Sequence, residues 1–305
     1  MSPAPGPLIL DFDGSVGPLP GARRIQLARH QDRIRYGCRL ADLRRLGGEL
    51  EALDPGEIRS AFLGSGDFHH VTHLLLERRA AAGPFQVLVF DNHPDNMRFP
   101  WGIHCGSWVH HSSRLPFVSR ITVVGIASAD VRWNHLWENH LGALSRGKVR
   151  YLCFAPVSRA ARLLRIRGIE DFRASRERFA DALAGHLAAD PAPIYLSIDK
   201  DVLTSGAVRT NWDQGVMSAD ELLGAVRLLR GRLLGLDVCG EISFHRYEQR
   251  WKRMLTRLDG QAARPPADLL LLQAEHHAFN LQLLAAAGLA AGRGHEDVVD
   301  AGKVR

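Results

Sequence analysis

The stretch Val87-Leu88-Val89-Phe90-Asp91-Asn92-His93-Pro94-Asp95 joins an apolar run to a cluster of ionisable groups. A second stretch, Ile194-Tyr195-Leu196-Ser197-Ile198-Asp199-Lys200-Asp201, has the same order. Short and mostly apolar runs of this kind are typical of parallel strands that are buried on both faces. Because open parallel sheets bind ligands at the carboxyl ends of their strands, we expect both clusters at one sheet edge.

Apolar runs and helical periodicity alternate along the chain. Strands are expected at 8–12, 61–64, 87–91, 121–124, 149–154, 194–198 and 234–238, and helices at 71–82, 173–188, 219–230 and 269–287. This alternation predicts an α/β fold in which helices cover both faces of a mostly parallel sheet. We expect one catalytic domain over residues 1–287. Residues 288–305, which are rich in Ala and Gly and end in mixed charges, are expected to form a flexible tail.

The composition is that of an ordinary globular protein. The chain has 305 residues, of which 46% are hydrophobic and 24% charged, and its net charge is +6. No run of Lys and Arg is longer than two residues, and no basic stripe contains aromatic residues, so nucleic-acid binding is not expected. We see no signal peptide, no apolar stretch of bilayer-spanning length and no paired cysteine spacing. These observations favour a cytoplasmic enzyme that does not bind membranes.

The acidic clusters predict a metal site. Asp91, His93 and Asp95 occupy alternate positions, so an extended backbone would point all three to one side. Asp199 and Asp201 repeat this spacing after a second strand. With few cations nearby, such carboxylates would repel one another, and a divalent metal is the common remedy. The simpler alternative is a pair of strand-end turns and helix caps, for which Asp and Asn are favoured.

A third element is Phe62-Leu63-Gly64-Ser65-Gly66-Asp67-Phe68-His69-His70, which predicts a strand, a glycine turn and a helix start. Glycine lets the backbone approach a site closely, and a histidine here could complete the metal set. The three elements together, between about residues 60 and 245, resemble the ureohydrolase superfamily of arginases, agmatinases and formiminoglutamases. Those enzymes carry Gly-Gly-Asp-His, Asp-x-His-x-Asp and Ser-x-Asp-x-Asp in this order.

The resemblance implies a three-layer arginase-like fold and two Mn²⁺ ions, although such ligands also accept other divalent metals. The ligands it implies are Asp91, His93, Asp95, Asp199, Asp201 and either His69 or His70. Phe68 interrupts the first motif, so the choice between the two histidines stays open. Asp67 would be the carboxylate that orients the chosen histidine.

Two further segments suggest catalytic roles under the same resemblance. Gly102-Ile103-His104-Cys105-Gly106 matches a histidine segment of the family, which makes His104 the candidate general acid. Leu236-Asp237-Val238-Cys239-Gly240-Glu241 matches a late strand whose glutamate grips the guanidinium group, which nominates Glu241. Asp201 would help to stabilise the tetrahedral intermediate of guanidine hydrolysis, and urea would leave. Taken singly, His104 could be structural and Glu241 a surface residue.

The substrate is expected to be a small-molecule or peptide guanidine. Phe99, Trp101, Trp108 and Trp212 suggest a more apolar pocket than free arginine requires, and arginine within a peptide is one option. A homo-oligomer is possible by analogy with the family. Cys105 and Cys239 are expected near the centre of the site as small buried side chains.

Other functions compete with guanidine hydrolysis. Leu10-Asp11-Phe12-Asp13-Gly14-Ser15 resembles the nucleophile motif of haloacid-dehalogenase-type phosphatases, with Asp11 and Asp13 as the acting carboxylates. An amide hydrolase or deacetylase could share the arginase-like architecture while using one metal. A relative that binds without catalysis is a further option, although it would have little need for so many buried charges.

Overall fold

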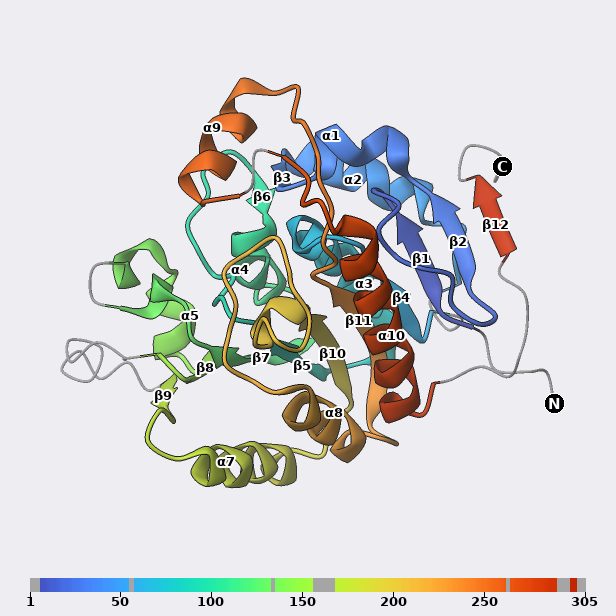
Figure 1. Ribbon diagram of the computed structural model, residues 1–305. Helices are drawn as coiled ribbons and strands as arrows, with labels where there is room; N and C mark the ends of the chain where they lie inside the picture. Colours follow the sequence, from blue (N-terminus) through green and yellow to red (C-terminus); the bar gives the residue numbers. More distant parts are fainter. Residues whose placement is uncertain are drawn as a thin grey trace.

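The computed structural model describes residues 6–54, 58–132, 135–155, 168–261, 264–289 and 297–300. A ten-stranded sheet with the order β12-β2-β1-β4-β11-β10-β5-β7-β8-β9 runs through its centre, and all its neighbours pair in parallel (Figure 1). Its strands are β1 Leu8–Asp11, β2 Arg23–Gln26, β4 Ser60–Phe62, β5 Phe85–Phe90, β7 Val118–Ile126, β8 Val149–Cys153, β9 Ile169–Asp171, β10 Ile194–Asp199, β11 Leu233–Cys239 and β12 Asp297–Asp300. Two short strands, β3 Gly37–Cys38 and β6 Ile103–His104, form a separate antiparallel pair.

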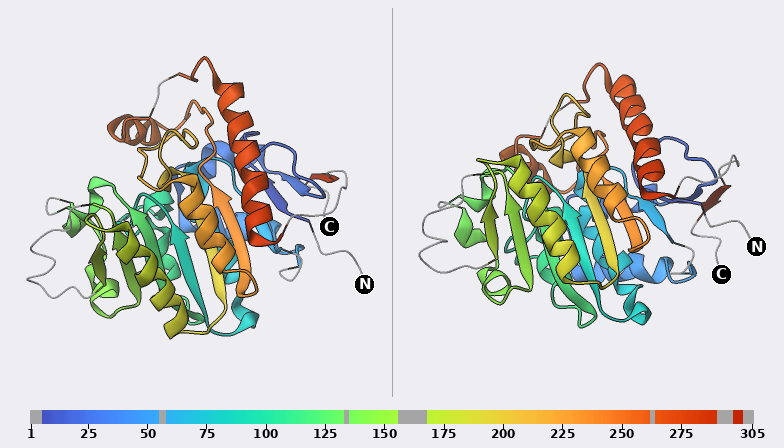
Figure 2. Two further views of the ribbon diagram at one scale, coloured as in Figure 1. Left: turned by 60° about the horizontal axis from the view of Figure 1, so that its bottom comes forward. Right: turned by 90° about the horizontal axis from the view of Figure 1, so that it is seen from below.

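Helices lie on both faces of the sheet, which gives three layers (Figure 2). One face carries α1 Gln31–Ile34, α2 Leu40–Glu49, α3 Thr72–Glu77, α4 Trp108–Ser112 and α5 Leu141–Ser145. The other carries α7 Arg176–Ala189, α8 Ala219–Leu228 and α10 Leu269–Ala287. Helix α9 Arg250–Leu258 lies near β3 and β6, and its Trp251 and Leu255 pack against Tyr36 and Cys105 (Figure 1).

The central strands are mostly apolar because both of their faces are covered. In β5, Val87 and Val89 belong to the hydrophobic cluster on one side of the sheet, whereas Leu88 and Phe90 belong to the cluster on the other side. All six residues of β5 and all six of β10 are buried. This double burial fixes the register and brings the polar ends of these strands to one edge.

The fold confirms the predicted parallel sheet between helical layers, and each predicted strand and helix has a counterpart with shifted ends. The helix predicted over 71–82 is shorter, because α3 ends at Glu77 and a 3-10 turn, Ala80–Ala82, follows. Segment 288–305, predicted as a flexible tail, contains β12, which pairs with β2; residues 290–296 and 301–305 lie outside the described residues. Within the described part, no helix has the length and apolar character needed to cross a bilayer.

Candidate metal centre

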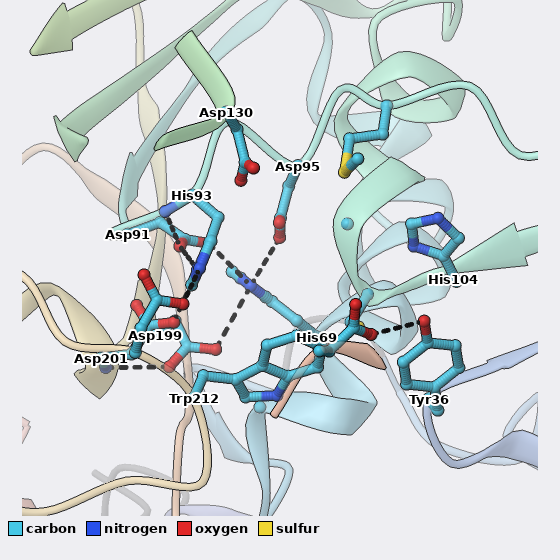
Figure 3. Close-up of a pocket in the computed structure, with 16 residues that line it drawn as sticks. Tyr36, His69, Asp91, His93, Asp95, His104, Asp130, Asp199, Asp201 and Trp212 are labelled. Atoms are coloured by element: carbon cyan, nitrogen blue, oxygen red, sulfur yellow. Dashed lines mark hydrogen bonds and ion pairs between the residues drawn. The ribbon is translucent and has the colours of Figure 1, made fainter. Parts of the chain in front are cut away.

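The ends of three central strands bring the predicted ligands together. Strand β4 leads through Gly64 into a 3-10 helix, Gly66–Val71, that carries His69. Asp91 directly follows β5, and Asp199 is the last residue of β10. Because β4, β11, β10 and β5 are consecutive in the sheet, these side chains converge on one place (Figure 3). The convergence is the one expected at the carboxyl edge of a parallel sheet.

Two donor sets overlap at Asp91. In the first, the His69 Nδ1 atom lies 3.1 Å from Asp91 Oδ2 and 3.0 Å from Asp95 Oδ2. In the second, the His93 Nδ1 atom lies 2.9 Å from Asp201 Oδ2 and 3.5 Å from Asp91 Oδ1. Asp91 therefore offers one oxygen to each set, as a carboxylate that bridges two ions would. Asp199 lies beside the first set, with its Oδ2 atom 3.7 Å from His69 Nδ1.

Both histidines are held by their other ring nitrogen. Ser197 Oγ donates to Asp237 Oδ1 at 2.7 Å and lies 2.9 Å from His69 Nε2, so it can only accept a hydrogen bond from that nitrogen. The proton of neutral His69 is thereby placed on Nε2, and the lone pair of Nδ1 faces the carboxylates. His93 Nε2 lies 2.8 Å from Asp213 Oδ1 in the same way. Such outer partners fix the tautomer of metal-binding histidines.

The charges of this cluster favour binding of a cation. Burial and the charge of Asp91 raise the pKa of Asp95 to about 8. Burial and the charges of Asp199 and Asp91 hold the pKa of Asp201 well above its ordinary range. Within the described part, buried Asp91 Oδ2 accepts no hydrogen bond, although His69 Nδ1 is close. Nitrogen and oxygen donors with this uncompensated charge fit divalent metal ions.

Asp95 is held in an unusual backbone conformation. Its φ of 47° lies in the left-handed region, which non-glycine residues rarely adopt. The buried Trp108 Nε1 donates to Asp95 Oδ2 at 2.6 Å, and the Trp108 ring centroid lies 4.8 Å from that of His69. The Trp108 side chain thus contacts both Asp95 and His69 and helps to hold these two residues of the first donor set in place. Strain that the surrounding structure maintains in this way is typical of functional sites.

A cavity of about 210 Å³ opens over the two donor sets. Besides the ligands, three further carboxylates line it, and no lysine or arginine is among its described lining residues. These carboxylates belong to Asp130, Asp213 and Asp259. His104 lines the wall beside Tyr36, across from the carboxylates of the centre (Figure 3). Burial and His111 lower the pKa of His104 to about 3, so its ring is neutral at pH 7.

Comparison with known proteins identifies the fold. No protein-family model matches the chain. An uncharacterized protein of Thermotoga maritima is 28% identical over 194 residues, which cover 63% of this chain and 62% of that protein. The chain thus spans about three-fifths of the length of the curated relative it matches. Arginase from Bacillus subtilis superposes over 83% of this chain and 78% of its own, with 13% identity and a TM-score of 0.51.

Formimidoylglutamase from the same bacterium superposes over 82% of this chain and 68% of its own, with 14% identity and a TM-score of 0.51. The chain has the arginase fold. The fold expected from the three motifs is therefore confirmed.

The first motif supplies His69 and not His70 to the donor sets. His70 does not line the cavity, and neither of its buried ring nitrogens has a hydrogen-bond partner in the described part of the chain. Burial, with a contribution from Lys252, holds the pKa of His70 well below its ordinary value. The extra residue Phe68 moves the ligand one position, because it packs into the core against Phe12 at a ring distance of 4.6 Å.

The sequence predicted that Asp67 would orient the histidine of the donor set, but Asp67 does not contact His69. Its carboxylate accepts hydrogen bonds from Arg35 Nε at 2.6 Å, Gln261 Nε2 at 2.7 Å, Trp212 Nε1 at 3.1 Å and Tyr247 Oη at 3.1 Å. This buried carboxylate instead ties together loops that wall the cavity. The outer partner of His69 is Asp237, which acts through Ser197.

Glu241 lies outside the cavity, so its predicted contact with a guanidinium group is not supported. Strand β11 ends at Cys239, and Gly240 turns the chain with a φ of 88°. After this turn the buried Glu241 carboxylate accepts from Lys200 Nζ at 2.6 Å and from Asn280 Nδ2 at 2.7 Å. Both bonds fall on Oε1, and Oε2 lies 3.3 Å from His276 Nδ1, so this carboxylate faces Lys200, Asn280 and His276 and does not line the cavity.

The phosphatase interpretation also fails in this arginase fold. Asp11 Oδ2 accepts from Arg24 Nη1 at 3.0 Å, and Asp13 Oδ2 accepts from Ser243 Oγ at 2.6 Å. Neither aspartate lines the cavity or belongs to a donor set among the described residues. Lys200, the lysine that such a mechanism would need, is engaged by Glu241.

The predicted apolar pocket is acidic instead. Of the four aromatic residues named above, Trp212 alone lines the cavity. Trp101 is 65% exposed and Trp108 is fully buried, whereas the Phe99 ring packs on His104 at 4.2 Å. Sequence reasoning assigned no role to Ser197, Asp213 or Asp237. The serine of Ser-x-Asp-x-Asp was a usable signal, because its alternate spacing places it on the same face as Asp199.

Proposed function

We propose that this protein is a hydrolase that uses two divalent metal ions to cleave a C–N bond of a guanidinium or amidinium group. The observation that carries the proposal is the pair of donor sets that share Asp91 at the floor of an acidic cavity. The arginase fold supports it, since the same sheet edge carries the donors. With a guanidine as substrate, the products would be urea and an amine.

The chain would hold the first ion through His69, Asp91, Asp95 and Asp199, and the second through Asp91, His93, Asp199 and Asp201. Bound ions of this kind supply Lewis acidity and lower the pKa of water toward neutrality. Manganese is the metal that the resemblance implies. Asp201 would also help to stabilise the tetrahedral intermediate, as a member of the second donor set.

His104 would move the proton. Its ring is neutral at pH 7, so it must accept a proton before it can donate one. The His104 side chain lines the cavity in which a substrate would bind. We propose that His104 takes a proton released by the attacking water and passes it to the leaving amine.

The cavity walls would attract a cation. Asp130 and Asp259 are close enough that the charge of Asp130 helps to raise the pKa of Asp259, after burial, while Tyr36 Oη donates to Asp259 Oδ2 at 2.7 Å. Carboxylates in a concave site concentrate positive ligands. They replace Glu241 as the groups that would receive a guanidinium or amino group. Asp213, whose side chain is 66% exposed, lies at the outer side and would be met first.

A peptide and a small molecule are both considered as carriers of the guanidine. A cavity of about 210 Å³ suits a small substrate or the end of one side chain. We include arginine within a peptide, because such a side chain would need only to insert its end into the cavity.

Amide hydrolysis is a second candidate, and the position of Glu241 favours it. Without that glutamate in the cavity, selection for a guanidinium group rests on Asp130, Asp213 and Asp259, and these would also accept an acylated polyamine. The two candidates differ in their products, since an amide yields a carboxylate and an amine but no urea.

The deciding experiment measures urea release by the metal-loaded protein with arginine, agmatine, guanidino acids and arginine-containing peptides. Acetylated amines are assayed in parallel for amine release. The double variant Asp91→Ala with Asp201→Ala serves as the blank. Urea from the intact protein alone supports guanidine hydrolysis, and the preferred substrate separates small molecules from peptides. Amine release without urea would transfer the proposal to amide hydrolysis.

The acidic walls are tested with two single variants. We expect Asp130→Asn and Asp259→Asn to raise KM for a cationic substrate while metal content stays at the wild-type level. Glu241→Gln, in contrast, should lower thermal stability and leave KM unchanged. A KM that depends on Glu241 and not on the wall aspartates would contradict this assignment.

A further inference from the structure

A thiol lies against the first donor set. Cys239 is the last residue of β11, and its register partner in β10 is Asp199, so both side chains leave the sheet on the same face. Cys239 Sγ donates to Asp199 Oδ2 at 3.2 Å. A ring nitrogen of His69, a carboxylate oxygen of Asp199 and the sulfur all lie within 4.8 Å of one another.

These distances suit a shared ion. Two ligands that bind one metal at about 2.1 and 2.3 Å lie about 3–3.6 Å apart when their angle is between 90° and that of a tetrahedron. The separation of Sγ and Oδ2 falls in this interval. Cys239 is fully buried, and Asp91 Oδ2, which accepts no hydrogen bond among the described residues, lies 3.1 Å from Nδ1 of the same histidine. The thiol thus lies beside the carboxylates of the first donor set.

We propose that Cys239 is a thiolate ligand of the ion held by His69 and Asp199, and that it makes this half of the centre selective for zinc, cobalt or ferrous iron over manganese or magnesium. The inference rests on the two-metal centre proposed above. Thiolate is a soft ligand that zinc and cobalt accept and that magnesium and manganese disfavour. On binding, the S–H bond breaks, the proton passes to solvent, and the sulfur keeps the electron pair that forms the metal–sulfur bond.

A matched cysteine shows why position matters. Cys105 is also buried and lines the same cavity, yet it belongs to no donor set in the described part of the chain. Its surroundings are Tyr36 and Tyr247, with which it forms a small apolar cluster. The alternative for Cys239 is that of a small filler whose S–H group is hydrogen-bonded to a carboxylate. The two roles differ in whether sulfur bonds to metal.

Cobalt binding distinguishes them. Wild type, Cys239→Ser and the control Cys105→Ser are stripped with a chelator, titrated with Co²⁺, and followed by near-ultraviolet absorbance and elemental analysis. We expect a thiolate-to-cobalt charge-transfer band in wild type and in the control, at about two cobalt ions per chain. Cys239→Ser should lack the band, and its preference for zinc over manganese in a competition titration should fall about 10–100-fold.

The outcomes separate this inference from the proposed centre. Two cobalt ions in wild type without the band, or a band that survives in Cys239→Ser, would overturn the role of Cys239 and leave the centre intact. No cobalt binding by wild type would overturn both. If Cys239→Ser fails to fold, Cys239→Ala is used, with circular dichroism as the check on its fold.

Discussion

Replacement of Ser197 by alanine is the sharpest single test of how the centre is built. The Ser197 hydroxyl accepts from His69 Nε2 at 2.9 Å and is fully buried. In Ser197→Ala, a metal at Nδ1 would force the proton to stay on Nε2 without a partner. Without metal, the carboxylates of Asp91 and Asp95 hold His69 through Nδ1 at 3.1 and 3.0 Å, so the orientation of its ring depends less on Ser197. The metal-bound state, in which Nδ1 faces the ion, therefore bears more of the loss.

The magnitude follows from the lost contact. A buried N–H group left without a partner costs about 1–3 kcal/mol. Loss of an outer partner of a metal-binding histidine typically weakens affinity about 10–100-fold, which corresponds to about 1.4–2.7 kcal/mol. The two estimates agree, so we expect Ser197→Ala to raise the metal Kd by about one to two orders of magnitude.

The assay is a competition titration against a chelator, with Ser112→Ala as the control. Ser112 is also fully buried, and its Oγ lies 2.9 Å from a ring nitrogen of His73, outside the cavity. Ser112→Ala should lower thermal stability and leave metal affinity unchanged. Wild-type affinity in Ser197→Ala, or equal losses in both variants, would refute the assigned role of Ser197.

Four further outcomes are expected. Asp91→Asn removes the carboxylate common to both donor sets, so elemental analysis should find at most about one metal ion per chain, whereas a full complement would contradict the sharing of Asp91. His104→Asn should lower kcat about 10²–10⁴-fold with metal content unchanged, and an unaltered kcat would exclude His104 from proton transfer. The pKa of His104 is about 3 in the folded state and near 6.5 when unfolded, so the unfolded chain binds more protons between these two pH values. The free energy of unfolding should therefore fall as pH drops from about 6.5 to 3. This dependence on pH should be weaker in His104→Asn. Lys252→Met removes three hydrogen bonds from Nζ, of 2.7, 3.0 and 2.8 Å, to the carbonyls of residues 32, 33 and 35. The free energy of unfolding, measured with denaturant, should fall by about 3 kcal/mol or more. A fall of less than about 1 kcal/mol would contradict this expectation.

The central part of the fold could be predicted from the sequence because strands that are buried on both faces have a mostly apolar local composition. Strands β5 and β10 are buried along their whole length and mostly apolar, since helices cover both faces, and the ionisable groups begin at their carboxyl ends. Strand β2, which lies between β12 and β1 and has the sequence Arg-Arg-Ile-Gln, carries no such signal. Its pairing with β1 depends on partners elsewhere in the chain, which local composition does not specify.

Part of the candidate site could be predicted from local sequence spacing, and part could not. Alternate spacing after a strand nominated Asp91, His93, Asp95, Asp199 and Asp201. The extended backbone assumed for that spacing does not continue, because β5 ends at Phe90, Asp95 is left-handed and Asp201 lies in a 3-10 helix. Glu241 was misplaced, because a single turn at Gly240 reverses where its side chain points. Asp213 approaches His93 from 120 residues away, on a loop whose path no local pattern encodes.

The assembly of the centre from several strands bears on the order of events during biosynthesis. His69 and Ser197, which form one hydrogen-bonded pair, are separated by 128 positions in the chain. A nascent chain that has emerged only through β5 and β7 has one complete acidic motif but lacks Asp199, Asp201 and Cys239. Because contacts of such sequence separation form late in folding, a high-affinity metal site should appear only once the sheet is closed around β10 and β11. Metal would then bind only to fully folded molecules and could not direct the early steps of folding.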